Sequence, residues 1–236
     1  MSDRLDPARL DELWDFSAPA VSAEKFAAET PSGPVAAAEL ATQRARALGL
    51  AGRGEEADAL LDSIEPVAPV VVIRIALERG RRRNSSGHPD QAVPYFVEAL
   101  ELAEREGEDF LAIDAAHMLA IADEEHSGEW TARGIQRVDA SDDPRAKRWG
   151  IALHNNLGWT HHDAELYPEA LAEFELADAA ARAYGSGEQQ QIAQWAIARC
   201  LRSLGRIDEA LAIQFTLAEL RPDDEYVREE IALLRG

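Results

Sequence analysis

Residues 155–177 read NNLGWTHHDAELYPEALAEFELA. The stretch carries two small residues, Gly158 and Ala170, that are separated by twelve positions. Beyond Ala170, the apolar side chains of Phe174 and Ala177 continue at helical spacing. Because small residues let two helix backbones approach closely, the stretch predicts a helical hairpin in which one small residue faces the other.

The same spacing occurs five times along the chain. The pairs of small residues are Ala45 and Ala57, Gly80 and Ala92, Ala120 and Ala132, Gly158 and Ala170, and Ala198 and Ala210. The second members of successive pairs are 35 to 40 residues apart, a period that is typical of stacked helical hairpins. The predicted hairpins span residues 34–70, 71–107, 109–141, 144–186 and 188–221, in one continuous domain.

The amino-acid composition favours a helical protein and argues against several classes of binding partner. The 236 residues include 44 alanines and 25 leucines, an inventory that favours helices over strands. A formal net charge of -20 opposes binding to nucleic acid and to anionic lipid. The single cysteine, Cys200, excludes an internal disulfide and a Cys-rich zinc site. With neither a secretory signal nor a long apolar segment, we expect a cytoplasmic protein with no nucleic-acid or membrane partner.

Additional helices are predicted at both ends of the array. Residues 1–31 predict a helical hairpin, with Asp6 before Pro7 opening its first helix and Ser22 capping its second. Residues 223–236 predict a capping helix that covers the last hairpin. The apolar face of this helix is predicted to carry Val227, Ile231 and Leu234.

The repeated pattern resembles the tetratricopeptide repeat of bacterial proteins. The matching residues are Asn156-Leu157-Gly158, Ala170, Phe174 and Ala177 in the fourth copy; Ile197-Ala198, Ala210, Leu217 and Pro222 in the last; and Ala45, Ala57, Leu61, Ile64 and Pro69 in the first. The third copy departs from the pattern with Gly134 inside its second helix. Over residues 34–222, the resemblance implies an all-α, right-handed superhelical solenoid of about five hairpins that binds proteins or peptides without enzymatic activity.

In such a solenoid, the first helix of each hairpin lines a concave groove. The candidate groove residues are Thr42, Arg46, Arg74, Arg81, Asn84, His117, Asn155, Trp159, His162, Trp195, Arg199 and Arg202. Arginine forks hold carboxylates and tryptophans offer flat apolar area, so the predicted partner is an extended protein or peptide segment with acidic or C-terminal carboxylate groups. Asn155 offers both a donor and an acceptor to a peptide backbone, as helix asparagines do in the long-repeat relatives that the pattern resembles.

Plainer interpretations stay open for some of these residues. The arginines from Arg79 to Arg83 end a predicted helix, where solvated cations complement the helix dipole. Trp159 and Trp195 are also suited to the core between repeats.

Two other functions compete with a peptide-binding module. One is a self-associating scaffold or regulatory subunit, such as a homodimer. The other is a metal-dependent enzyme that uses the region from His154 to Glu165. Spacing argues against a metal there, because His154 and His161 are about 10 Å apart along a helix and Gly158 between them has no ligand atom. We therefore expect no enzyme, no metal and no other cofactor.

Overall fold

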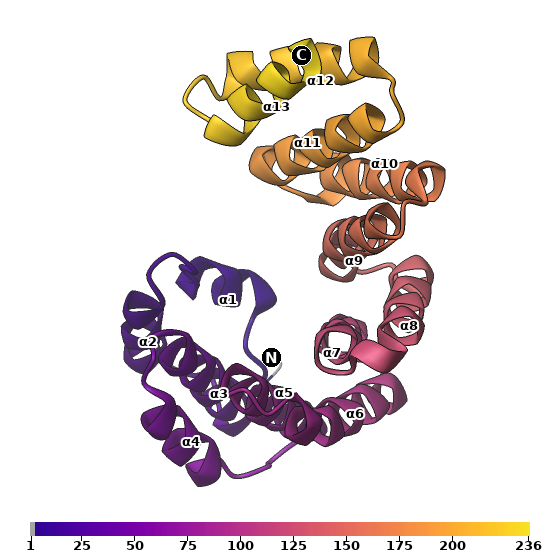
Figure 1. Ribbon diagram of the computed structural model, residues 1–236. Helices are drawn as coiled ribbons and strands as arrows, with labels where there is room; N and C mark the ends of the chain where they lie inside the picture. Colours follow the sequence, from indigo (N-terminus) through magenta and orange to yellow (C-terminus); the bar gives the residue numbers. More distant parts are fainter. Residues whose placement is uncertain (1–2) are drawn as a thin grey trace. The chain divides into compact units, whose positions relative to one another are not determined.

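The computed structural model describes residues 3–236, which form thirteen α-helices and one short 3-10 helix and contain no strand (Figure 1). The predicted all-α class is confirmed. The chain divides into two compact units, unit 1 up to Trp130 and unit 2 from Thr131 to Gly236, so the division falls inside one helix, α8 (Ser127–Ala140). None of the helices in residues 3–236 is long and apolar enough to cross a membrane.

Unit 1 contains an N-terminal helix pair followed by helical hairpins. Its elements are α1 (Pro7–Leu13), α2 (Pro19–Ala28), α3 (Pro34–Leu50), α4 (Gly54–Ser63), α5 (Pro69–Ser85), α6 (Pro89–Glu106), α7 (Asp109–Ala122), the 3-10 helix (Glu124–His126) and the start of α8. The first helix of a hairpin is called its A helix and the second its B helix. The A helices α3, α5 and α7 pack against one another in sequence, and α2 packs on α3.

Unit 2 contains two further hairpins and a terminal helix. Its elements after α8 are α9 (Pro144–Asp163), α10 (Tyr167–Tyr184), α11 (Gly187–Ser203), α12 (Ile207–Leu220) and α13 (Glu225–Arg235). The A helices α9 and α11 are neighbours, and α13 packs on both α11 and α12 (Figure 1). The terminal helix therefore takes the place that the A helix of a following hairpin would occupy.

Glycine on an A helix makes room for an aromatic ring on the B helix. A Cβ added to Gly80 would lie 2.4 Å from the ring of Phe96, and one added to Gly158 would lie 2.5 Å from the ring of Phe174. Both rings are fully buried. The sequence predicted that each small residue faces another small residue. In these two hairpins, the atoms nearest to a Cβ on the glycine belong to the ring four residues beyond the B-helix alanine.

Four hairpins share one turn geometry between their A and B helices. The residue after the helix cap adopts a left-handed conformation at Gly52, Gly87 and Gly205, with φ of 77°, 78° and 73°, and at Glu165, with φ of 60°. In the first of these turns, the amide of Arg53 donates to the carbonyl of Leu48 at 2.9 Å, which satisfies a carbonyl left free at the helix end. The third hairpin has a 3-10 helix in this place.

The third hairpin also departs from the predicted register. The sequence places Ala132 against the A helix, yet Ala132 is exposed while Thr131 and Gly134 are buried. The prediction that Ala132 packs against another helix is therefore wrong. This is also where the contacts divide the chain, although the sequence predicted one continuous domain.

One helix-end prediction is confirmed and two others need correction. The Asp6 side chain accepts from the amide of Ala8 at 3.0 Å and so caps α1, and Asp143 caps α9 in the same way. Ser22 does not cap α2, which begins at Pro19; its buried hydroxyl donates to the carbonyl of Asp15 and accepts from the Asp15 amide. On α13 the buried residues are Val227, Glu230 and Leu234, so Glu230 stands where an apolar Ile231 was predicted.

Candidate functional site

The predicted site residues lie on one side of the A helices, which we call the A-helix face of each unit. In unit 1 this face belongs to α3, α5 and α7, and in unit 2 to α9 and α11. Each face is described separately.

A buried carboxylate organises the first part of the unit 1 face. Glu39 of α3 is 1% exposed and accepts from Nε of Arg74 at 3.1 Å and from the amide of Leu5 at 2.9 Å. The hydroxyl of Thr42 donates to the carbonyl of Glu39 at 2.7 Å, and its side chain is fully buried. The prediction that Thr42 and Arg74 are open to a partner is therefore wrong.

Arg81 is held by two more buried carboxylates. Its guanidinium donates to Glu78, one turn earlier on α5, and to Asp114 of α7. Burial alone would raise the pKa of Asp114, but the positive charges of Arg81 and Arg46 hold that pKa below its ordinary value. Arg81 was also predicted to be open to a partner, and that prediction is wrong because its charge is neutralised inside the unit.

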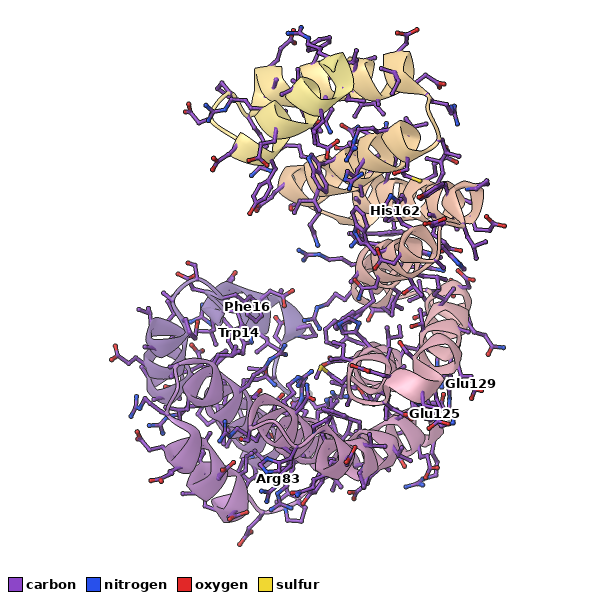
Figure 2. The ribbon with its side chains drawn as sticks, viewed as in Figure 1. Trp14, Phe16, Arg83, Glu125, Glu129 and His162 are labelled. Carbon is purple, nitrogen blue, oxygen red and sulfur yellow. The ribbon has the colours of Figure 1, made fainter. Side chains whose placement is uncertain are left out.

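Arg46 is engaged by aromatic rings at the end of α1. Its guanidinium carbon lies 5.5 Å from the ring centre of Trp14 and 5.7 Å from that of Phe16. The two rings are stacked, with centres 4.5 Å apart (Figure 2). The indole of Trp14 donates to Oε1 of Gln43 at 3.1 Å. Cation–π attraction therefore orients Arg46 within unit 1.

The two remaining candidates in unit 1 are half-buried. Asn84 lies in the last turn of α5, where its carbonyl accepts from the amide of Gly87 at 3.0 Å. His117 lies on α7, and burial lowers its pKa although the carboxylate of Asp114 opposes this shift. Their roles in binding stay predictions.

In unit 2 the terminal helix supplies the carboxylate for the two A-helix arginines. Glu230 of α13, which is 5% exposed, pairs with Nε of Arg199 at 3.1 Å and with Nε of Arg202 at 2.8 Å. The sequence predicted that a partner would supply this carboxylate. An acidic partner would have to displace Glu230 to reach these arginines.

A run of rings follows the A-helix face of unit 2. The ring of His162 lies 5.3 Å from that of Trp159, Trp159 lies 6.1 Å from Trp195, and Trp195 lies 6.5 Å from Tyr226 of α13. Trp159 also packs with its edge toward Phe174, at 4.9 Å between ring centres. Trp159 is therefore partly buried against the core, in agreement with the alternative interpretation.

Two polar atoms on this face are buried and unpaired. Within residues 3–236, neither Oδ1 of Asn155 nor Nε1 of Trp195 has a hydrogen-bond partner. Asn155 lies one helical turn before Trp159, whose ring neighbours that of Trp195. An acceptor and a donor therefore lie on neighbouring A helices, and leaving such groups unpaired costs free energy.

A pocket of about 250 Å³ opens beside Trp195. Its lining comes from α11, α12, α13 and the segment that joins the last two: Gln191, Ile192, Trp195, Leu217, Arg221, Asp224, Tyr226 and Val227. Of these, the sequence had identified only Trp195 as a site residue. Ile192 is three residues before Trp195 and so shares its helix face, which was a usable signal. Tyr226 depends on how α13 docks, and the repeat pattern does not report that.

The histidine-rich segment forms ordinary polar contacts. Nε2 of His162 lies 2.9 Å from the hydroxyl of Ser203, and burial together with Arg199 and Arg202 lowers the pKa of His162. His154 lies 2.7 Å from a carboxylate oxygen of Glu173. No group of three or more His, Cys, Asp or Glu side chains in residues 3–236 is arranged to hold a metal ion.

One known family matches part of the repeat region. Residues 73–122, which cover most of α5, all of α6 and α7, match the family model described as Tetratrico peptide repeat. Residues 73–122 therefore match a tetratricopeptide repeat, and the other hairpins resemble it in fold. Comparison with curated protein sequences gives no match.

Several solved structures share the repeat fold. BtubC (BKLC) from P. vanneervenii is 14% identical, with 98% of this chain and 94% of that chain covered and a TM-score of 0.63. The apo quorum sensor NprR from B. thuringiensis is also 14% identical, with coverage of 96% and 66% and a TM-score of 0.62. A signal transduction ATPase from Pyrococcus horikoshii with a tetratricopeptide repeat sensor is 18% identical, with a TM-score of 0.67.

These likenesses show the fold alone, because every identity is low. The structural match with the ATPase covers 89% of this chain but only 32% of the ATPase chain, so this chain spans about a third of that protein. What the repeats of this chain bind has to be argued from its own residues.

Proposed function

We propose that the protein is a non-enzymatic binding module that holds an extended peptide or protein segment on the A-helix face of unit 2. The observation that carries the proposal is the pair of buried, unpaired polar atoms, Oδ1 of Asn155 and Nε1 of Trp195. A peptide backbone offers one N–H donor and one C=O acceptor per residue, which complements this pair regardless of sequence.

The rings around these atoms supply apolar contact area. Trp159, Trp195 and Tyr226 provide flat surfaces along which a segment can lie, and aromatic side chains contribute strongly to peptide interfaces. The similarity of the fold to a quorum sensor and to a repeat sensor supports a recognition role, and repeat folds of this kind generally act without catalysis. A cytoplasmic location stays a prediction.

The ion pairs change the kind of partner that we expect from the one that the sequence suggested. Because Glu230 already neutralises Arg199 and Arg202, backbone and apolar contacts carry the binding in this proposal and an acidic group on the partner is not required. Affinity should therefore depend only weakly on salt, since screening acts on exposed charges.

Selection from a random twelve-residue peptide library on the full-length protein tests the proposal. Enriched peptides should bind in solution, and Asn155→Leu should weaken them about tenfold, the effect of one lost hydrogen bond. Asn156→Leu is the matched control, because Asn156 is the adjacent, exposed asparagine of α9. A library that yields no binder, or binders that are indifferent to Asn155→Leu, would refute the proposal. If the protein bound only its own copies, measured by sedimentation, the self-associating scaffold would replace it.

A further inference from the structure

The first described residues of the chain lie against the A helices of unit 1 without forming a helix. Asp3, Arg4 and Leu5 precede α1, and we call them the N-terminal strap. Figure 1 shows this segment entering α1 from the side on which α5 and α7 lie. The strap bonds to residues between 32 and 104 positions later in the chain, from the start of α3 to the start of α7.

The backbone and the side chain of Asp3 close the start of α3. The amide of Ala36 donates to the Asp3 carbonyl at 3.0 Å, and the amide of Val35 donates to Oδ2 of Asp3 at 3.4 Å. These amides belong to the first turn of α3, where Gly33 at the N-cap has no side chain to accept from them. A Cβ added to Gly33 would lie 1.8 Å from Oδ1 of Asp3, so the glycine also leaves the space that Asp3 fills.

The guanidinium of Arg4 joins two carboxylates from different elements. It donates through Nη1 and Nη2 to the two carboxylate oxygens of Glu108, the N-cap of α7, and through Nη2 to Oε1 of Glu39 at 3.4 Å. The amide of Leu5 donates to the other oxygen of Glu39 at 2.9 Å. A bidentate pair of this kind fixes the orientation of the arginine as well as its position. The acidic side chains at this end of unit 1 therefore bind a cation, whereas the sequence predicted an acidic partner.

The contacts of the strap can be exchanged without disturbing the helices. The Arg4 side chain is 39% exposed, and ion pairs at such exposure contribute little to stability. Leu5 packs, partly buried, against the apolar cluster formed by α1 to α4. A pair between helices, such as Arg81 with Asp114, cannot separate unless a helix moves, but the strap can leave while every helix stays in place.

We propose that the N-terminal strap is an internal ligand, and that the surface it covers is a second peptide-binding site. The site fits an extended segment of another protein in which an acidic residue, an arginine and an apolar residue follow one another, as they do in the strap. The strap competes with that segment, because its tether gives it an effective concentration on the order of millimolar. This site lies in unit 1 and is independent of the peptide site proposed in unit 2.

A peptide with the sequence of the strap tests the site in trans. The probe is the N-acetylated peptide Asp-Arg-Leu-Asp-Pro-Ala, residues 3–8, with a fluorescent label at its carboxyl end, and its anisotropy is measured with the full-length protein. Arg4→Glu places a like charge beside Glu108 and Glu39 and so releases the strap. We expect this variant to bind the probe about tenfold more tightly than the wild-type protein, in which the tethered strap competes.

Arg9 provides the matched control for this change of charge. It lies on α1, is 46% exposed and pairs with Glu12 on the same helix and with Glu29 at the end of α2. Arg9→Glu should bind the probe no better than the wild-type protein does. An equal gain in both variants would show that net charge controls binding, and would refute the site.

A reversed charge makes the test independent of damage to the fold. Glu108→Arg repels Arg4 and so also releases the strap, but its site should reject the probe. A second probe, with glutamate in place of the arginine, should bind to Glu108→Arg and not to Arg4→Glu. A protein that was merely loosened would not exchange its preference in this way.

Three outcomes would overturn the proposal. They are no binding of the first probe to Arg4→Glu, equal binding of both probes to Glu108→Arg, and a wild-type dimer in sedimentation that Arg4→Glu dissolves, which would make the strap a contact between copies. In the Arg4→Glu background, Asn155→Leu should leave binding of the probe unchanged, because Asn155 lies in unit 2. A loss of binding there would assign the probe to the face of unit 2 and equally refute the site.

Discussion

The two units treat the polar groups of their A-helix faces in different ways. In unit 1 the charges pair within the face, Glu39 with Arg74 and Arg81 with Asp114. In unit 2 neutral atoms of Asn155 and Trp195 are buried without a partner in residues 3–236. A satisfied network fixes packing but leaves nothing for a ligand, whereas unpaired groups cost stability unless something binds them.

The comparison indicates that a binding site is to be sought where polar side chains lack a partner within the protein. The sequence favoured the arginines because arginine forks hold carboxylates. The structure shows four of those forks already paired with the protein's own carboxylates and Arg46 placed against aromatic rings. Natural sequences break their own packing rules mainly at functional or strained sites. The unpaired polar atoms of unit 2 are therefore better candidates for a functional role than the paired charges of unit 1.

The largest effect is expected from breaking the network of unit 1. Glu39→Gln removes the carboxylate while keeping its volume, so the buried guanidinium of Arg74 loses its counter-charge. The free energy of unfolding should fall by about 3–5 kcal/mol, as for other buried pairs that lose one member. Urea denaturation followed by circular dichroism measures this change.

An exposed pair in the same unit is the control for this experiment. Glu56 pairs with Arg53 at 2.6 Å on the surface of unit 1, and Glu56→Gln should give no measurable change. Equal losses for Glu39→Gln and Glu56→Gln would mean that the network is no tighter than a surface ion pair.

The next effect concerns a packing rule that both units share. Gly80→Ala in unit 1 and Gly158→Ala in unit 2 each push a Cβ into a buried phenylalanine ring. Each should lose about 1–3 kcal/mol of stability, the usual cost of overpacking. Gly128→Ala is the control, because a Cβ there meets no described atom within 4 Å. A loss in one unit only would show that the ring can shift in the other.

A third experiment tests the hairpin of unit 2 that lacks this ring. Gln214 of α12 occupies the position of Phe174 in the preceding hairpin, and it is fully buried, with no partner for either amide atom in residues 3–236. Gln214→Met should raise the free energy of unfolding by about 1–2 kcal/mol, because it removes two unsatisfied polar atoms. Gln136→Met, at an exposed position of α8, should not. A loss of stability in Gln214→Met would indicate that the amide is satisfied by bound water.

The sequence predicted the helices and their faces, but not the partners of polar side chains. Helical spacing of small and apolar residues is a local signal, and the predicted hairpin that begins at residue 144 agrees with the start of α9 at Pro144. Pairing of Arg81 with Asp114, or of Arg202 with Glu230, depends on helix packing and side-chain rotamers across about 30 residues. A pattern assigns a residue to a face without showing whether a neighbouring helix already occupies it.

A smaller effect is expected from the turns between A and B helices. Glu165 adopts the left-handed conformation that glycine adopts at Gly52, Gly87 and Gly205. Because a side chain strains this conformation, Glu165→Gly should gain about 0.5–1 kcal/mol after the entropy of glycine in the unfolded chain is counted. Ala164→Gly, next to it at φ of -82°, should lose stability instead. Thermal unfolding distinguishes the two, and a gain in Ala164→Gly would contradict the argument from strain.

The smallest effect concerns two histidines whose pKa values shift in opposite directions. In unit 2, burial and the nearby Arg199 lower the pKa of His162 below 6.5, so the unfolded chain takes up this proton first as the pH falls. His162 therefore reduces stability progressively once the pH drops below about 6.5.

In unit 1, the hydrogen bond and charge of Asp123 raise the pKa of His126. The stabilising contribution of His126 is therefore present below pH 6.5 and is lost as the pH rises through the higher folded pKa. His162→Gln should flatten the loss of stability as the pH falls from 6.5 to 5, and His126→Gln should flatten the loss of stability as the pH rises above 6.5. Unfolding curves on both sides of pH 6.5 test the signs, and a flattening on the same side for both variants would mean that the environments of the two imidazoles do not differ as the structure places them.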